Sequence, residues 1–293
     1  MQTTSKPYGR YSTGVLLTLT SAAAFGVMPV FAAAADRSGA SLVTTLFLRF
    51  TIAALVMFAW LLWRGLKLPD GKTLFLLACM GALGYAGQAF CYFTALTMVP
   101  AGTVALLLYT YPAIVTILSV TVLRQSIQRS DIIALGLASA GIVMVAGIHP
   151  GGQALGIFWA LMAALIYSLY IIAGTVALRN TDSFTAATII NSTAAIIYAA
   201  VALRQGLQLP GTAIGWAAVV CIALISTVLA IGAFFSGIKR IGPVQASMLS
   251  MAEPVVTLVF SCLLLGEILT TAKVAGGILV VGAGLLLTYK RSA

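Results

Sequence analysis

Residues 108–125 read LYTYPAIVTILSVTVLRQ, and residues 250–267 read SMAEPVVTLVFSCLLLGE. The two stretches lie 142 positions apart, and each has a proline at its fifth position, Pro112 in the first and Pro254 in the second. Matching leucines or alanines would mean little in apolar segments, but a proline at the same depth of two such segments indicates an internal repeat. The chain is therefore expected to consist of two related halves.

The two stretches belong to a chain of 293 residues that is 61% hydrophobic and only 8% charged, whereas soluble domains carry about 25% charged residues. Its apolar runs are roughly 18 to 24 residues long, the length that an α-helix needs to cross a hydrocarbon core of about 30 Å. Strand-like alternation is absent, which argues against a β-barrel. We expect an all-α polytopic membrane protein with ten transmembrane helices, near residues 13–35, 42–63, 73–97, 102–123, 132–148, 157–178, 185–203, 214–236, 244–265 and 273–289.

The basic residues are distributed unevenly between the connections of these spans. When alternate connections are placed on opposite sides, the side of both termini receives twelve Lys and Arg residues and the other side receives three. Cytoplasmic loops carry an excess of Lys and Arg, so we predict an integral, multi-pass protein of the cytoplasmic (inner) membrane with both termini cytoplasmic. The net charge of +10 comes without a basic stripe or interleaved aromatic residues, which argues against a nucleic-acid partner.

Each half holds five spans, an odd number, so the second half must enter the membrane in the opposite orientation. We predict a first five-helix repeat over residues 1–150 and a second, inverted five-helix repeat over residues 151–293. Inverted repeats are the architecture of many secondary transporters, whose solute site lies near the bilayer midplane where the repeats meet.

Segments of the second half carry a resemblance to a known family. They are Pro243-Val-Gln-Ala through Ala252-Glu253-Pro254-Val255, Leu265-Gly266-Glu267-Ile268-Leu269, and Ala275-Gly276-Gly277-Ile278-Leu279. Together they resemble the second repeat of the drug/metabolite transporter superfamily, in its EamA-type ten-helix branch. The first half is similar in a degraded form, with Tyr111-Pro112 for the proline segment, Arg49 within Phe-Leu-Arg-Phe, and Gln125 where the family usually has Glu.

This resemblance covers essentially the whole chain. It implies a transporter, commonly an exporter of amino acids or other small metabolites, and it does not fix the substrate. Because Gln125 departs from the acidic residue of the family, no ionic role is carried over to that position.

The prolines inside spans are candidate hinges. Proline removes a hydrogen bond to the carbonyl four residues before it, so Pro112 should free the carbonyl of Leu108 and Pro254 that of Ser250. Such carbonyls must face protein or a wet cavity, because an unpaired one in hydrocarbon costs several kcal/mol. Two interpretations stay open: a kink that only shapes the bundle, or a hinge that lines a cavity. Pro29 is a third kink, in the first span, without a clear counterpart.

Two ionisable residues fall inside spans, where a charge costs about 2.5 to 3.5 kcal/mol. Arg49 either has a structural role, bonding freed carbonyls or an acidic partner, or acts as a gate or a contact for a solute carboxylate, which its guanidinium fork suits. Glu253 is either a neutral acid hydrogen-bonded to a neighbouring helix or a proton carrier. Burial favours the protonated form of a carboxyl, so Glu253 could exchange a proton in each transport cycle, with protons as the coupling ion.

Polar and aromatic side chains mark the helix faces that point away from lipid. Residues three, four or seven positions apart share a helix face, as Tyr85, Gln88 and Tyr92 do on the third span, Tyr167 and Tyr170 on the sixth, and Ser250, Glu253 and Thr257 on the ninth. We predict that these side chains line a cavity for a small amphipathic solute such as an amino acid. The expected lining residues are Phe25, Arg49, Tyr85, Gln88, Tyr92, Tyr109, Tyr111, Tyr167, Tyr170, Asn191 and Ser250.

Glycines in two apolar spans have no strand before them and are not phosphate loops. Gly136 and Gly141 in the fifth span, and Gly276 and Gly282 in the tenth, are instead expected to let helices pack closely.

The leading hypothesis is a secondary transporter that works by alternating access as an exporter, with a small-molecule substrate and the lipid bilayer as its partners. An importer or exchanger of the same fold, a channel and a membrane-embedded enzyme are the alternatives. An enzyme is disfavoured because His149 is the only histidine and no span holds paired acids. The four cysteines lie in apolar runs without CxxC spacing, so we expect no cofactor, no metal site and no disulfide framework.

Overall fold

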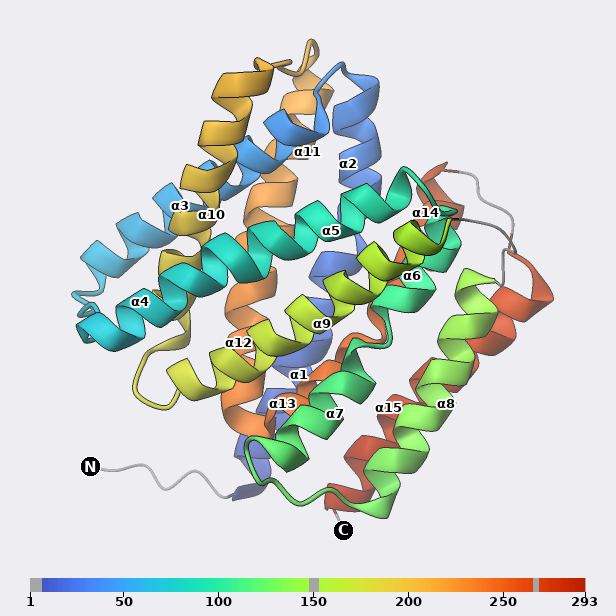
Figure 1. The fold of residues 1–293 in the computed structure, drawn as a ribbon. Helices are drawn as coiled ribbons and strands as arrows, with labels where there is room; N and C mark the ends of the chain where they lie inside the picture. The colour runs from blue at the N-terminus through green and yellow to red at the C-terminus, as the bar shows by residue number, and fades with distance from the viewer. Residues whose placement is uncertain (1–6, 148–152, 266–268, 293) are drawn as a thin grey trace.

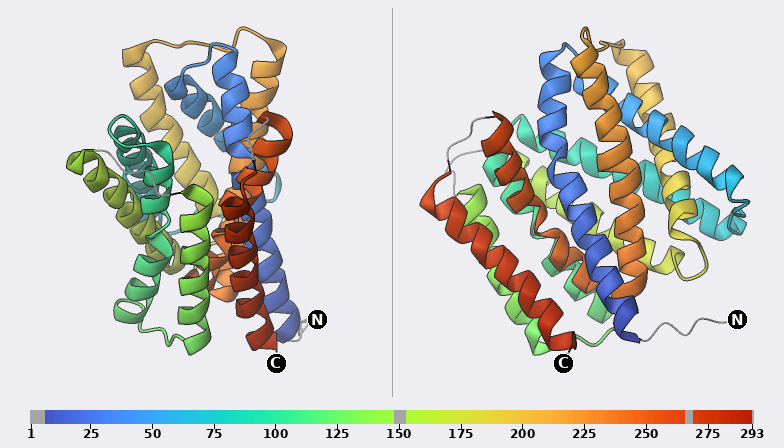
Figure 2. Two further views of the ribbon diagram at one scale, coloured as in Figure 1. Left: turned by 90° about the vertical axis from the view of Figure 1, so that its right-hand side faces the viewer. Right: turned by 180° about the vertical axis from the view of Figure 1, so that it is seen from behind.

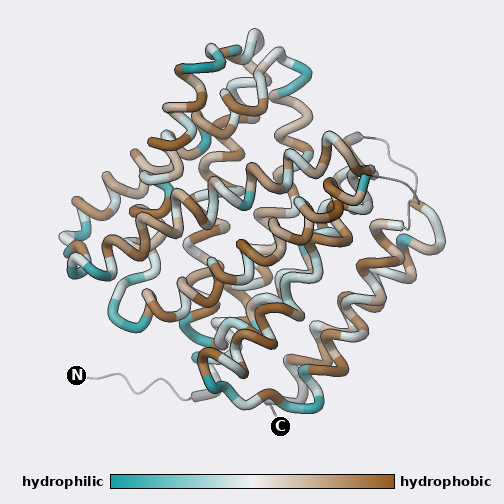
Figure 3. Tube along the Cα trace, in the orientation of Figure 1, coloured by the Kyte–Doolittle hydropathy of each residue, from teal (hydrophilic) through white to brown (hydrophobic). Residues whose placement is uncertain are grey.

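The structure, a computed structural model, describes residues 7–147, 153–265 and 269–292 of the chain. Within these ranges the chain forms helices and no strand, and ten segments are long and apolar enough to cross a membrane. Figure 3 shows hydrophobic residues along the lengths of the helices and hydrophilic residues gathered at their ends. The predicted all-α fold of ten transmembrane helices is confirmed.

Half of the spans are single α-helices and half are divided. The single ones are α3 (Leu42–Trp63), α8 (Arg129–Ala146), α9 (Ala154–Ala177), α10 (Ser183–Gln205) and α15 (Thr271–Ser292). The first, fourth and ninth spans are pairs: α1 (Pro7–Gly26) with α2 (Met28–Arg37), α6 (Ala101–Leu108) with α7 (Tyr111–Thr121), and α13 (Pro243–Ser250) with α14 (Glu253–Leu265). The third and eighth contain a π-helical segment: α4 (Gly71–Cys79), η1 (Met80–Ala86) and α5 (Gly87–Leu96), then α11 (Ala213–Ala223), η2 (Leu224–Leu229) and α12 (Ala230–Ile241).

These boundaries reproduce the internal repeat. The helices α6 and α13 begin and end 142 residues apart, and so do the first residues of α7 and α14 and of α8 and α15. Shifted by the same amount, η1 would overlap η2, so both repeats carry a π-segment at matching depth, a feature that often marks functional sites. The chain is built from two inverted five-helix repeats. The predicted division between residues 150 and 151 lies outside the described residues.

Each predicted proline kink is a break between two helices. Helix α6 ends at Leu108 and α13 ends at Ser250, which are the residues whose carbonyls Pro112 and Pro254 leave without a helical partner. All three prolines, Pro29 included, stand in the first turn of the helix that follows, where a missing N–H group does no harm.

Helices of one repeat pack against helices of the other. Helix α1 lies along α12, and the repeat-related α9 lies along α5; α3 pairs with α10, and α8 pairs with α15 at one edge of the bundle (Figures 1 and 2). The first residues of α1 and the last of α15 lie at the same end (Figure 1), here called the terminal end, and the opposite end is called the distal end.

Glycine permits the close approach of α8 and α15. A Cβ on Gly141 would lie 2.6 Å from the carbonyl oxygen of Gly276, and a Cβ on Gly276 would lie equally close to the carbonyl oxygen of Gly141. The packing role predicted for these two is therefore confirmed. It was wrong for Gly136 and Gly282, which have open space where a side chain would be, because they face away from the helix pair.

Acidic and hydroxyl side chains fix the starts of helices outside the apolar runs. The Asp182 carboxylate accepts hydrogen bonds from the backbone N–H groups of Phe184 and Thr185 at the start of α10. Asp131 accepts from the backbone N–H of Gln128 as half of a capping box on α8. These contacts satisfy N–H groups that have no partner inside the helix.

Candidate functional site

A cavity of about 650 Å³ lies between the two repeats. It reaches the distal half of the bundle, since its wall includes Val145 and Ala146 at the last turn of α8 and Lys273 in the first turn of α15. The terminal half below it is closed by buried apolar side chains, among them Val115, Phe235 and Met248. The structure is therefore open toward the distal end and closed toward the terminal end.

The two helix breaks meet in this cavity. The break between α6 and α7 contributes Tyr109, and the break between α13 and α14 contributes Glu253 and Pro254. Helix α13 packs against α7 and closes the terminal side, whereas the repeat-related helices α6 and α14 flank the open space. The state described here is thus asymmetric although the fold is nearly symmetric.

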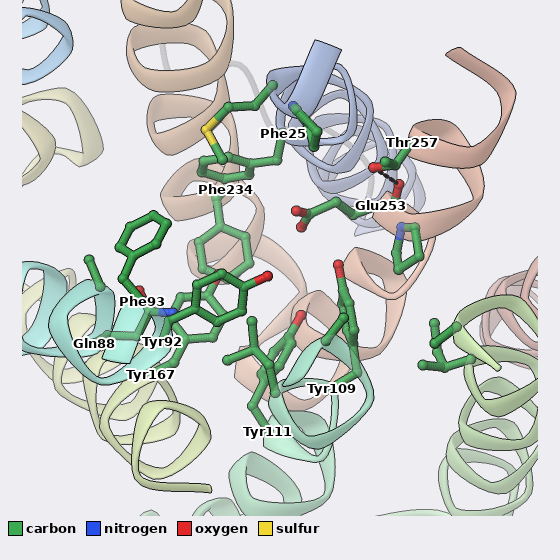
Figure 4. A pocket seen from close by; sticks show the side chains of 18 of the residues that line it. Phe25, Gln88, Tyr92, Phe93, Tyr109, Tyr111, Tyr167, Phe234, Glu253 and Thr257 are labelled. Atoms are coloured by element: carbon green, nitrogen blue, oxygen red, sulfur yellow. Dashed lines mark hydrogen bonds between the residues drawn. The ribbon is translucent and has the colours of Figure 1, made fainter. Parts of the chain in front are cut away.

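Glu253 carries the carboxylate of this site. Figure 4 shows that carboxylate directed into the space between Phe25 and Phe234 on one side and Tyr109 and Tyr111 on the other, with the Tyr109 hydroxyl pointing toward it. Its backbone is held to α1, because the Thr257 hydroxyl lies 3.1 Å from the Glu253 carbonyl and 2.9 Å from the Gly26 carbonyl. A carboxyl group thus faces the cavity on a locally fixed backbone.

Arg49 is the buried cation of the same wall. Its guanidinium donates to the Tyr85 hydroxyl at 2.8 Å and to the Met28 sulfur at 3.1 Å, and it lies 4.6 Å from the centre of the Phe50 ring. The Arg49 side chain is 5% exposed, and its Nε has no hydrogen-bond partner. These contacts are all neutral, which leaves the positive charge without an anionic contact among them and the Nε nitrogen without a hydrogen-bond partner.

Tyrosine rings form the floor of the cavity. Tyr111 and Tyr167 meet edge to face with centroids 4.7 Å apart, Tyr167 and Tyr170 stack at 6.0 Å, and Tyr85 meets Tyr170 edge to face at 5.9 Å. The Tyr111 hydroxyl also donates to the Ser247 carbonyl on α13 at 3.2 Å. An aromatic floor of this kind suits an apolar or aromatic part of a solute.

Most predicted site residues do come together. Those that line the cavity are Phe25, Pro29, Arg49, Tyr85, Gln88, Tyr92, Tyr109, Tyr111, Tyr167, Tyr170, Glu253 and Pro254. Three other predicted residues, Pro112, Asn191 and Ser250, do not line it. Pro112 is buried beneath the cavity floor.

Asn191 and Ser250 do not line this cavity. Asn191 is fully buried and its side-chain amide donates to the sulfur of Met57 on α3 at 3.3 Å, because that face of α10 is covered by α3. Ser250 was aligned with Glu253 and Thr257 on the assumption of one continuous helix. The break after Ser250 turns it away, and its hydroxyl donates instead to the Ala246 carbonyl at 2.9 Å.

Sequence reasoning missed two polar residues of the wall, Lys273 and Ser261. Lys273 is the first residue of the tenth predicted span and lies in the first turn of α15, as its repeat counterpart Asp131 lies in the first turn of α8. Of the other predicted features, His149 and the segment Gly266-Glu267-Ile268 lie outside the described residues. The side chains that are described include no group of three or more His, Cys, Asp or Glu residues that could hold a metal.

Repeat symmetry divides the cavity wall into two sets. For most lining residues, the position 142 residues away lies outside the cavity. For five pairs, both members line it: Phe25 and Tyr167, Met28 and Tyr170, Ala89 and Ile231, Tyr92 and Phe234, and Tyr111 and Glu253. These pairs surround the pseudo-symmetry axis, so they are called the central pairs below.

A cavity between inverted repeats, with broken helices meeting in it, defines a membrane transporter of small solutes. The chain belongs to the EamA-like transporter family, whose family model matches residues 12–147 and again residues 154–289. The two matches are offset by the same 142 residues that relate the helices, and they confirm the predicted resemblance.

Individual relatives are more distant. The chain is 26% identical over 239 residues to the uncharacterized inner membrane transporter YedA of Escherichia coli (strain K12), covering 79% of this chain and 77% of YedA. It is 26% identical over 231 residues to the protein PecM of Dickeya dadantii (strain 3937), covering 75% of each. A solved structure, described only as the crystal structure of a protein, matches with a TM-score of 0.83 and 22% identity over 97% of this chain and all of its own. That likeness shows the fold.

Proposed function

We propose that this protein is a secondary transporter of amino acids or related small amphipathic solutes, that it lies in the cytoplasmic (inner) membrane, and that it works as an exporter by alternating access. The observation that carries the proposal is Glu253, a carboxylate facing an aromatic cavity where the two repeats meet. The printed name of YedA, an inner membrane transporter, supports the membrane assigned here.

The cavity wall suits a solute with three kinds of group. Glu253 would pair with a protonated amine, and the tyrosine floor would pack against an apolar or aromatic side chain. Arg49 and Lys273, on the distal part of the wall, would attract a carboxylate, which Arg49 can bind through its unpartnered Nε. An α-amino acid with an apolar side chain combines all three.

Glu253 also supports coupling to protons. A carboxyl that lines the cavity can take up a proton from one side of the membrane and release it when a solute amine takes its place or when the cavity opens to the other side. The competing interpretation is that Glu253 stays a neutral acid and only fixes the break between α13 and α14.

The test uses purified protein in proteoliposomes, with a panel of amino acids, amines and small metabolites and with or without a pH gradient. The wild-type chain is expected to accumulate an amino acid against its gradient when protons can flow in exchange. Glu253→Gln should abolish gradient-driven accumulation, whereas the control Asp70→Asn, which removes an exposed carboxylate outside the membrane, should leave it intact.

Two results would count against the proposal in different ways. If no member of the panel moves in either direction, the transport function is wrong. If Glu253→Gln accumulates solute with an unchanged pH dependence, the protein is a transporter but Glu253 is not its proton carrier. Flux measured in vesicles of both orientations decides between export, import and exchange.

A further inference from the structure

The cavity residues outside the central pairs have repeat counterparts in the closed, terminal half of the bundle. When inverted repeats exchange conformations, positions that faced one side of the membrane are replaced by their counterparts facing the other. The counterparts in the closed half are therefore the positions that a second cavity, open at the terminal end, would expose.

Some of these counterparts have buried polar atoms without a hydrogen-bond partner, which independently suggests that they are exposed in another state. Among the described residues, seven buried side-chain nitrogen or oxygen atoms have no hydrogen-bond partner, and three of the seven belong to these counterparts although the counterparts are a small part of the chain. The three residues are Ser119, Ser226 and Asn191, the counterparts of Ser261, Gly84 and Arg49. All three are fully buried, and a buried polar atom without a partner is destabilising and calls for an explanation. Contact with water or solute in another state supplies one.

Further counterparts are buried hydroxyls that donate to carbonyls of their own helix. Ser247 donates to the Val244 carbonyl at 2.8 Å, and Thr227 donates to the Ile222 carbonyl at 2.9 Å. Together with Ser250, they give the closed half a set of hydroxyl groups at positions where the open half has Ala105, Tyr85 and Leu108. Hydroxyls paired in this way keep acceptor capacity for another partner.

A small hollow already exists at the terminal end. It has a volume of about 440 Å³ and is lined by polar residues that include Arg124, Gln125, Asp131 and Gln245. Asp131 is the repeat counterpart of Lys273, which lines the distal part of the main cavity. Through Asp131 the hollow is related by the repeat to the distal part of the main cavity, and α7 packs against α13 in the terminal half.

We propose that Ser119, Asn191, Ser226, Ser247 and Ser250 line a second solute cavity, open at the terminal end, that forms when α7 and α13 separate. Below its mouth, where Asp131 and Arg124 lie, this cavity presents neutral hydroxyl and amide groups, and Asn191 stands where the open cavity has Arg49. It takes a hydrogen-bonding solute that keeps its amine on Glu253 while its carboxylate exchanges Arg49 for neutral hydroxyl and amide groups. The inference rests on the proposed transport function.

The test is the accessibility of single cysteines. In a chain whose four native cysteines are replaced by alanine, Ser119→Cys and Ser226→Cys are exposed to a positively charged, membrane-impermeant methanethiosulfonate added to one side of sealed vesicles at a time. The matched control is Thr185→Cys, since Thr185 is 1% exposed and its hydroxyl also lacks a partner, but its repeat counterpart Val43 does not line the cavity. Ser261→Cys reports the open cavity.

Ser119→Cys and Ser226→Cys are expected to react from the side of the termini at least about tenfold faster than Thr185→Cys. The conformation with the second cavity open would make up roughly 0.1 to 10% of the population, and in that conformation it exposes residues 119 and 226 but not residue 185. Ser261→Cys should react from the opposite side. Rates for both test variants no higher than the Thr185→Cys rate, with and without a mixture of amino acids, would overturn the second cavity. Labelling without any solute flux would keep the cavity and contradict the transport function, and flux without labelling would do the reverse.

Discussion

Replacing Arg49 with glutamine distinguishes a solute contact from a structural role. The Arg49 guanidinium has only neutral partners, the Tyr85 hydroxyl at 2.8 Å and the Met28 sulfur at 3.1 Å, and its Nε has none. If a solute carboxylate supplies the missing partner, Arg49→Gln removes a hydrogen bond between charged groups, which contributes about 1.5 to 3 kcal/mol. The KM for a carboxylate solute should then rise about 10- to 150-fold, since each 1.4 kcal/mol is a factor of ten.

The assay compares transport of an amino acid with transport of its amide, which keeps the amine and the side chain but lacks the carboxylate charge. Wild-type protein should prefer the acid, and Arg49→Gln should lose most of that preference while changing little for the amide. Tyr85→Phe is the control, because it removes the neighbour that holds the guanidinium but leaves the positive charge in place. It should lower thermal stability and keep most of the preference.

The reasoning fails if Arg49→Gln slows the acid and the amide equally. Such a result, with a drop in melting temperature, would mean that Arg49 only joins α3 to η1 and α2. An unchanged KM for both solutes with normal stability would mean that the buried charge is not part of the solute path at all.

Other expected outcomes concern packing, gating and acid stability. Gly276→Ala would place a Cβ 2.6 Å from a backbone carbonyl of α8 and should lower stability by up to about 2 kcal/mol, an overpacking cost of about 1 to 3 kcal/mol less about 1 kcal/mol of helix propensity. On the same helix, Gly282→Ala has open space and should be neutral or stabilising in thermal unfolding in detergent. Tyr111→Phe removes the 3.2 Å bond from α7 to α13, worth about 0.5 to 1.5 kcal/mol, and should raise cysteine labelling from the terminal end by about 2- to 12-fold. The pKa of Asp70 lies below its ordinary value because the Thr73 side chain donates to its carboxylate. The stability that ionised Asp70 adds at the start of α4 is therefore fully present above the ordinary pKa and is lost as the pH falls through the lowered one. Asp70→Asn should lower the melting temperature at pH 7 and have no effect below the lowered pKa.

The fold could be predicted from the sequence because the bilayer imposes a length and a composition on each span. Ten apolar runs and a fixed repeat offset were enough to give ten helices in two inverted repeats. The π-segments η1 and η2 could not be predicted, because one extra residue in a helical turn changes neither hydropathy nor charge. The break before Glu253 could be placed from Pro254, but its size could not, and this error put Ser250 on the wrong face.

The candidate site was predictable to the extent that a polar residue in a span must face away from lipid. That rule gathers Tyr85, Gln88 and Tyr92 correctly. It does not say whether the protected face meets a cavity or another helix, and Asn191 meets α3. The pairing of helices decides this question, and it depends on long-range contacts that no local pattern encodes.

In the proposed transport cycle, the unequal chemistry of the two repeats would give the two pathways different affinities for the same solute. Arg49 and Lys273 line the open cavity, while their counterparts Asn191 and Asp131 lie in the closed half. In the proposed cycle, a solute carboxylate would meet Arg49 and Lys273 only in the state open to the distal end, and a ligand shifts a conformational equilibrium by its difference in affinity for the two states. Glu253 belongs to a central pair and is available in both. The amine would thus be held throughout the cycle, and the carboxylate would bias which side of the membrane the cavity faces.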